Sequence, residues 1–76
     1  MKLKDVLKVI SYLQDVQILV YKENNQDEIL YEGNVLEVPW IYVDYVLDLV
    51  NGDGEAVFSF INGKNESIIG IYVLEE

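Results

Sequence analysis

The feature that most constrains the fold is the stretch of residues 16–36, in which two strand-forming runs flank a polar loop. The first run, residues 16–21, is rich in β-branched and aromatic residues, and the second, residues 29–32, follows seven polar residues. We predict a β-hairpin with a long loop. Apolar residues stand at both odd and even positions of the first run, so each face of the sheet carries apolar side chains. At least one face has to be covered.

The segment before this hairpin has the spacing of an amphipathic helix. Between residues 2 and 13 the apolar residues recur every three or four positions and form one stripe, which consists of Leu3, Val6, Leu7, Ile10 and Leu13. Asp5 falls off the stripe and lies in the first turn, where a negative charge complements the helix dipole. Burial of the stripe offsets much of the entropy lost on ordering, so we predict that this helix covers one face of the sheet.

Turn sequences divide the second half of the chain into three further predicted strands, at residues 46–50, 55–61 and 67–74. The Asn-Gly and Asp-Gly pairs at 51–54 and 62–65 accept the positive φ angles of tight hairpins and predict an antiparallel meander. Gly70 predicts a bulge or the close approach of a neighbouring group. Pro39 ends any preceding strand and favours a single helical turn over residues 39–44.

These elements predict one small α+β domain over residues 1–76, in which the N-terminal helix packs on an antiparallel sheet of four to five strands built from hairpins. One helix covers only one face of such a sheet. The second apolar face has to be covered by the segment at Pro39, by another copy of the chain or by a partner protein. Of these three, we favour a homodimer.

The charge is strongly negative and unevenly distributed. Asp and Glu number 14 against five Lys, and the chain contains neither Arg nor His. Residues 1–22 carry four Lys and two acids, whereas residues 23–76 carry one Lys and twelve acids. Such a surface repels phosphates and anionic lipids, so we expect no direct nucleic-acid or membrane binding. Solubility is the favoured explanation of the acidity, and a surface aimed at a basic partner is the other.

The residue inventory also argues against catalysis. Without His or Cys the chain has no nucleophile–base pair of the Ser-His or Cys-His kind and none of the usual zinc ligands. Asn51, Asp53 and Glu55 faintly resemble a calcium loop, but Phe60 stands where a glutamate ligand is needed, so a polar turn is favoured. We predict a non-enzymatic protein with no cofactor and no metal. The lack of cysteine, signal-peptide pattern and long apolar run predicts a cytoplasmic location.

One cluster of aromatic and acidic residues is the candidate partner-binding site, and its members are Trp40, Tyr42, Asp44, Tyr45 and Asp48. The favoured interpretation is that the rings pack over the open end of a small core. The alternative is a protein-binding hot spot, because Trp and Tyr are enriched at such sites.

Several short segments carry a resemblance to a known group: Leu-Lys-Asp-Val-Leu at residues 3–7, the strand at 16–21, Leu-Tyr-Glu-Gly at 30–33 and Val-Pro at 38–39. In these segments the chain resembles small uncharacterised proteins encoded in phages and prophages of Gram-positive bacteria. The resemblance covers about the first 40 residues. It implies an N-terminal helix, a hairpin, a short helix near the proline and an accessory role inside a bacterial host cell, and it transfers no catalytic residue.

The leading functional hypothesis is therefore a non-enzymatic protein that acts through protein contacts as an oligomer. The alternative is an acidic mimic of nucleic acid that inhibits a host nuclease or another nucleic-acid-binding protein by salt-sensitive contact with its basic groove. Mimicry needs carboxylates in one stripe, and the candidates are Glu23, Asp27, Glu28, Glu32 and Glu37, with Asp44 and Asp48 as a pair.

Overall fold

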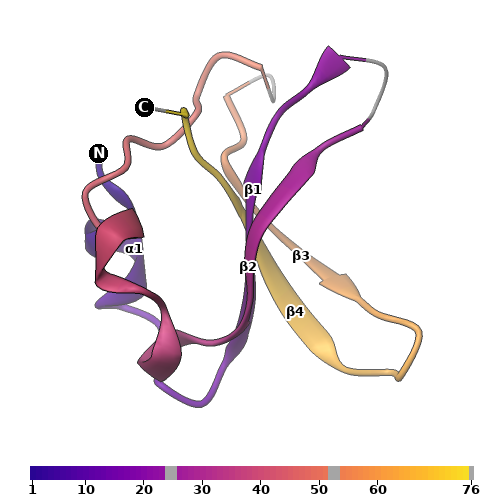
Figure 1. Ribbon diagram of the computed structural model, residues 1–76. Helices are drawn as coiled ribbons and strands as arrows, with labels where there is room; N and C mark the ends of the chain where they lie inside the picture. Colours follow the sequence, from indigo (N-terminus) through magenta and orange to yellow (C-terminus); the bar gives the residue numbers. More distant parts are fainter. Residues whose placement is uncertain (24–25, 52–53, 76) are drawn as a thin grey trace.

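The computed structural model describes residues 1–23, 26–51 and 54–75 and shows an α+β architecture (Figure 1). The elements are α1 (Leu3–Leu7), β1 (Asp15–Val20), β2 (Glu28–Asn34), the 3-10 turns η2 (Val35–Glu37) and η3 (Trp40–Tyr42), β3 (Val57–Ile61) and β4 (Ser67–Tyr72). None of the helices in the described ranges is long and apolar enough to cross a membrane.

The four strands form one mixed sheet in the order β2-β1-β4-β3. Strand β1 pairs antiparallel with β2, which confirms the predicted first hairpin, although residues 24 and 25 of its loop lie outside the described residues. Strands β3 and β4 form the second hairpin. The prediction of an antiparallel sheet is wrong, because the central strands β1 and β4 are parallel. Apolar residues outnumber polar ones in both strands, which is typical of central parallel strands.

The predicted strand at residues 46–50 is also wrong. Only two isolated bridges form there, Lys2 with Val46 and Leu47 with Val73. The segment instead connects the N-terminus to the end of β4, because the Leu47 amide donates to the Met1 carbonyl at 3.0 Å and the Asp48 amide donates to the Tyr72 carbonyl at 2.9 Å. The predicted meander is therefore reduced to the β3–β4 hairpin. Of the predicted turn at 51–54, residues 52 and 53 lie outside the described residues.

Helix α1 is much shorter than the predicted helix over residues 2–13, because it ends at Leu7. The chain beyond it turns away to bond with η2: the Leu36 amide donates to the Tyr12 carbonyl and the Val35 amide donates to the Gln14 carbonyl. Leu13, the last member of the predicted stripe, is 81% exposed. These long-range hydrogen bonds override the helical spacing of the sequence, since backbone groups there find partners outside a helix.

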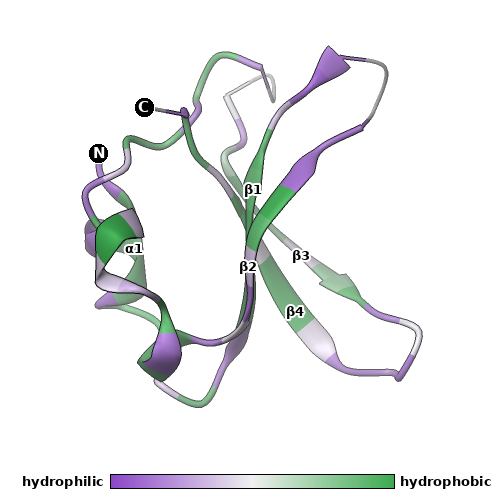
Figure 2. Cartoon of the chain, in the orientation of Figure 1, coloured by the Kyte–Doolittle hydropathy of each residue, from purple (hydrophilic) through white to green (hydrophobic). Residues whose placement is uncertain are grey.

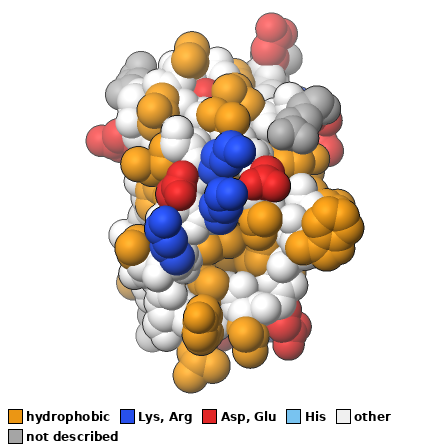
Figure 3. Space-filling view, turned by 90° about the vertical axis from the view of Figure 1, so that its left-hand side faces the viewer, with side chains coloured by type: hydrophobic (Ala, Val, Ile, Leu, Met, Phe, Trp, Pro, Cys, Tyr) orange, Lys and Arg blue, Asp and Glu red, His pale blue; other side chains and the backbone are white. Residues whose placement is uncertain are grey.

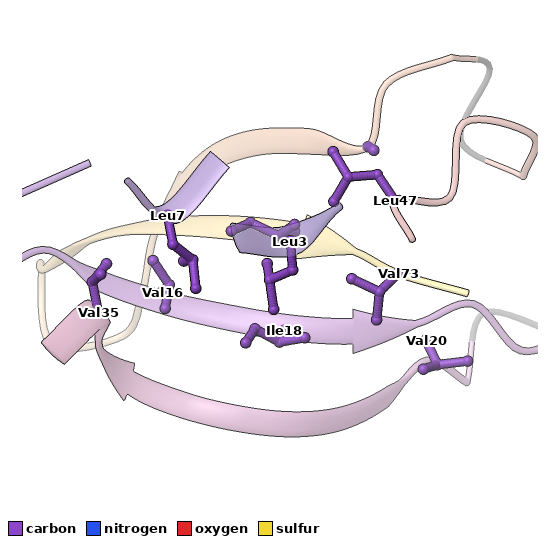
Figure 4. Close-up of a cluster of buried hydrophobic side chains, with 10 residues drawn as sticks. Leu3, Leu7, Val16, Ile18, Val20, Val35, Leu47 and Val73 are labelled. Carbon is purple, nitrogen blue, oxygen red and sulfur yellow. The ribbon is translucent and has the colours of Figure 1, made fainter. Parts of the chain in front are cut away.

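The hydrophobic core lies on one face of the sheet, which we call the closed face. Val16 and Ile18 of β1 and Ile71 of β4 point into it and are fully buried. The layer above them consists of α1 and the chain between β2 and β3, and it supplies buried side chains that include Leu3, Leu7, Val35 and Leu47 (Figures 1 and 4).

The turn η3 confirms the single helical turn predicted over residues 39–44. Its neighbours Val38 and Val43, together with Tyr42 and Tyr45, pack against the core cluster of the closed face. The Pro39 segment therefore lies on the same side of the sheet as α1 and does not cover the second face (Figure 1).

The opposite face of the sheet, the open face, is covered by its own aromatic side chains. Leu19 and Ile68 are buried there although they do not belong to the core cluster. The ring of Phe58 lies 5.7 Å from that of Phe60 and 5.5 Å from that of Tyr72, as measured between ring centroids. A β-carbon on Gly70 would collide with the Phe58 ring, which confirms the predicted close approach at Gly70.

Candidate protein-binding surface

The five predicted site residues do not form one surface. Trp40 is 81% exposed and stands at the start of η3. Tyr42 and Tyr45 are half-buried, and their rings meet edge to face with centroids 5.4 Å apart. Both tyrosines pack against the core cluster, which agrees with the packing interpretation for these two residues. The exposed ring of Trp40 has no such role.

Asp48 is a buried carboxylate that holds a turn. It is 2% exposed, and its side chain accepts hydrogen bonds from the Val50 amide, the Asn51 amide and the Asn51 side-chain amide at 2.7–3.0 Å. Burial raises the pKa of Asp48, but the hydrogen bonds from Asn51 and Val50 outweigh burial and leave the pKa below its ordinary value. This turn is the physical reason why no strand continues through residues 46–50.

Asp44 lies at the surface between two lysines of the N-terminal segment. Its carboxylate is 3.2 Å from the Lys4 ammonium and 3.9 Å from that of Lys2. On the same helix, Asp5 pairs with Lys8 at 3.6 Å, and a hydrogen bond from the Lys2 amide is the main cause that holds the pKa of Asp5 below its ordinary value. These pairs are exposed and add little stability, but they collect three lysines on one face (Figure 3).

An apolar groove of about 230 Å³ opens beside these lysines. Its walls are apolar or aromatic and its rim carries two lysines, and the lining residues are Lys4, Leu7, Lys8, Tyr12, Val35, Val38 and Val43. Turn η3 joins Val38 to Val43, so Trp40 and Ile41 lie next to the groove. Figure 3 looks onto this side of the molecule, where lysines stand at the centre, with acidic side chains beside them and hydrophobic side chains around them.

We call this surface the basic apolar face and define it by the groove together with Lys2, Trp40, Ile41 and Leu36. The last three side chains are all more than half exposed. The sequence pattern indicated Trp40 but did not indicate Tyr12, Leu36 or the lysines as its neighbours. The signal that could have indicated the lysines is the concentration of four of the five within residues 1–22.

The chemistry that this arrangement supports is binding. In the described part of the chain no three Asp or Glu side chains come together in a way that could hold a metal ion. A second hollow, of about 450 Å³, is lined mainly by polar residues such as Asn62, Lys64 and Glu66. Comparison of the chain with protein-family models, with characterised proteins and with solved structures finds no match.

Proposed function

We propose that the protein acts without catalysis, as a small α+β module that binds another protein through the basic apolar face. The observation that supports this proposal is the exposure of Trp40, which leaves 81% of a large aromatic side chain in water. Trp is the residue type most enriched at binding hot spots, and its burial by a partner is worth on the order of a few kcal/mol. Ile41, Leu36 and the groove extend the same apolar area.

The charges define the partner more closely. The chain carries a net charge of −9, yet Lys2, Lys4 and Lys8 gather on this one face. Asp5 and Asp44 offset most of this positive charge, so this face is the least negative side of the molecule and the side that an acidic surface approaches with the least repulsion. We infer a partner that presents an apolar segment bordered by Asp or Glu. The resemblance of the first 40 residues to phage and prophage proteins supports a search for it in the cytoplasm of Gram-positive bacteria.

The experiment compares three immobilised forms of the protein: the wild type, Trp40→Ala and Val50→Ala. Val50 is a matched control because it is 80% exposed and lies outside the basic apolar face. We expect the same bacterial proteins to be retained by the wild type and Val50→Ala and lost on Trp40→Ala, while all three melt within a few degrees of one another. Equal retention by Trp40→Ala, or no retention by the wild type, would contradict the proposal.

Mimicry of nucleic acid takes second place because four of its candidate carboxylates are already engaged. Asp48 is buried, and Asp44 lies between Lys2 and Lys4. Asp27 accepts a hydrogen bond from the Tyr72 hydroxyl, and Glu32 accepts one from the Gln17 side-chain amide. The carboxylates left for a phosphate-like stripe are those of Glu23, Glu28 and Glu37. Tight, salt-sensitive binding to a basic nuclease that survives Trp40→Ala would reverse this order.

A further inference from the structure

The two edges of the sheet differ in how they are protected. Strand β2 carries Glu28 and Glu32, and its pairing with β1 has a register shift between Ile18 and Leu19. Charges and bulges of this kind keep other chains from pairing with an edge. Strand β3 has the sequence Val-Phe-Ser-Phe-Ile, without a charge or a proline, and its Val57 and Ile61 are exposed. Figure 2 shows hydrophilic segments along β2 and none along β3.

The backbone of β3 has hydrogen-bonding groups that point away from the sheet. The Tyr72 amide donates to the Ala56 carbonyl and the Asn62 amide donates to the Glu66 carbonyl, at the two ends of the β3–β4 ladder. Antiparallel ladders bond every second residue, so the even-numbered residues from 56 to 62 bond to β4. The amides and carbonyls of Val57, Ser59 and Ile61 therefore face outward, where a further strand would pair.

The sequence of β3 is complementary to itself when it is reversed about Ser59. In antiparallel pairing Val57 would oppose Ile61 of another copy, and Phe58 would oppose Phe60. The outward groups fall at Val57, Ser59 and Ile61, which is the set this register requires. We propose that a second copy of the chain pairs its β3 antiparallel to the first, with the two-fold axis at Ser59, so that one sheet runs through both protomers.

The side chains on both sides of the new pairing support this register. Phe58 and Phe60 of the second copy form a non-hydrogen-bonded pair, in which opposing side chains approach most closely, and they extend the aromatic row of the open face across the axis.

This dimer goes beyond the proposed function, because β3 is at the edge of the sheet and the basic apolar face lies over the closed face (Figure 1). The first test is sedimentation velocity of the wild type, Ser59→Lys and Ser11→Lys at concentrations from about 1 to several hundred micromolar. Ser59→Lys would place two like charges opposite each other at the axis and weaken dimerisation at least about tenfold, whereas the equally charged and exposed Ser11→Lys leaves it unchanged. Ser59 is exposed, so the variant keeps its fold, which circular dichroism checks.

The second test reports the register and uses the absence of cysteine from the chain. In the proposed pairing the two copies of residue 59 have Cα atoms about 5.5 Å apart, within disulfide range. Ser59→Cys is therefore expected to form an interchain disulfide in air much faster than Ile61→Cys, although Ile61 is also exposed. A monomeric wild type at several hundred micromolar, an unaffected dimer of Ser59→Lys, or faster cross-linking through Ile61→Cys would each overturn the proposal.

Discussion

The two faces of the sheet are built from the same strands but exclude water by different means. On the closed face, Ile18 and Ile71 lie beneath a second layer of chain that brings in Leu3 and Leu7. On the open face, Leu19 and Ile68 are also buried, and the rings of Phe58, Phe60 and Tyr72 form an aromatic cover from the sheet itself, with Phe58 against Gly70. A small domain can thus shield both sides of a sheet with one covering layer, provided that the other side carries aromatic rings that pack against one another.

The largest expected effect comes from a charge placed on the closed face. Leu7→Asp puts a carboxylate at a position that is 7% exposed. The free energy needed to bury an unpaired charge exceeds the unfolding free energy of a domain of this size. We therefore expect the variant to be unfolded at room temperature. Leu13→Asp is the matched control, because Leu13 belongs to the same sequence stripe but is 81% exposed. Thermal melts followed by circular dichroism should therefore separate the two variants, and similar melts would show that α1 does not close this face.

A smaller effect is expected from an added methyl group on the open face. Gly70→Ala pushes against the Phe58 ring, which has to move off the strand, and overpacking of this kind costs about 1–3 kcal/mol. Gly63→Ala serves as the control, because a β-carbon there meets no atom within 4 Å. Urea unfolding measures both variants, and a Gly70→Ala protein as stable as the wild type would mean that the aromatic cover is loose.

The smallest effect is expected from the hydrogen bond between Tyr72 and Asp27, at the edge of the aromatic cover of the open face. The hydrogen bond from the Tyr72 hydroxyl to Asp27, together with burial, raises the pKa of Tyr72 to about 12. Tyr72→Phe removes this bond and should cost about 1 kcal/mol at neutral pH. An absorbance titration should lose the phenol that ionises near pH 12, whereas Tyr12→Phe, at an exposed position, should retain it.

The same pair predicts how stability changes with pH. The pKa of Tyr72 is raised in the folded state, so its contribution is complete below about pH 10, where an unfolded tyrosine ionises, and is lost as the pH rises toward 12. The difference in unfolding free energy between the wild type and Tyr72→Phe should therefore shrink over this range. A constant difference from pH 8 to pH 11 would count against the hydrogen bond.

Local sequence patterns predicted the parts of the fold that local interactions determine. The first hairpin follows from its strand-forming residues, the turn η3 follows Pro39, and the crowding at Gly70 follows from the lack of a side chain there. Local patterns failed to predict the structure where contacts between residues far apart in the sequence determine it. The helix stops at Leu7 because Tyr12 and Gln14 bond to η2, and β1 takes β4 as a parallel neighbour, which no spacing in the sequence indicates.

The candidate site shows the same division. The aromatic residues predicted the region, but their exposure depends on packing that the sequence does not encode locally: Tyr42 and Tyr45 pack on the core, while Trp40 remains in water. The burial of Asp48 and its bonds to Asn51 were likewise not visible in the charge pattern. The lysines join the site because the Leu3 and Lys4 amides donate to the Tyr45 and Val43 carbonyls, which places the N-terminal segment beside Asp44.

The parallel pairing of β1 with β4 also bears on how the protein is made. Asp15 pairs with Ile68, so the strand that completes the centre of the sheet leaves the ribosome long after the strand that it joins. Until then the first hairpin exposes apolar side chains of β1 to solvent or to a chaperone. Folding is therefore completed only after translation has passed β4, and stalled or shortened chains are the form of this protein most prone to aggregate.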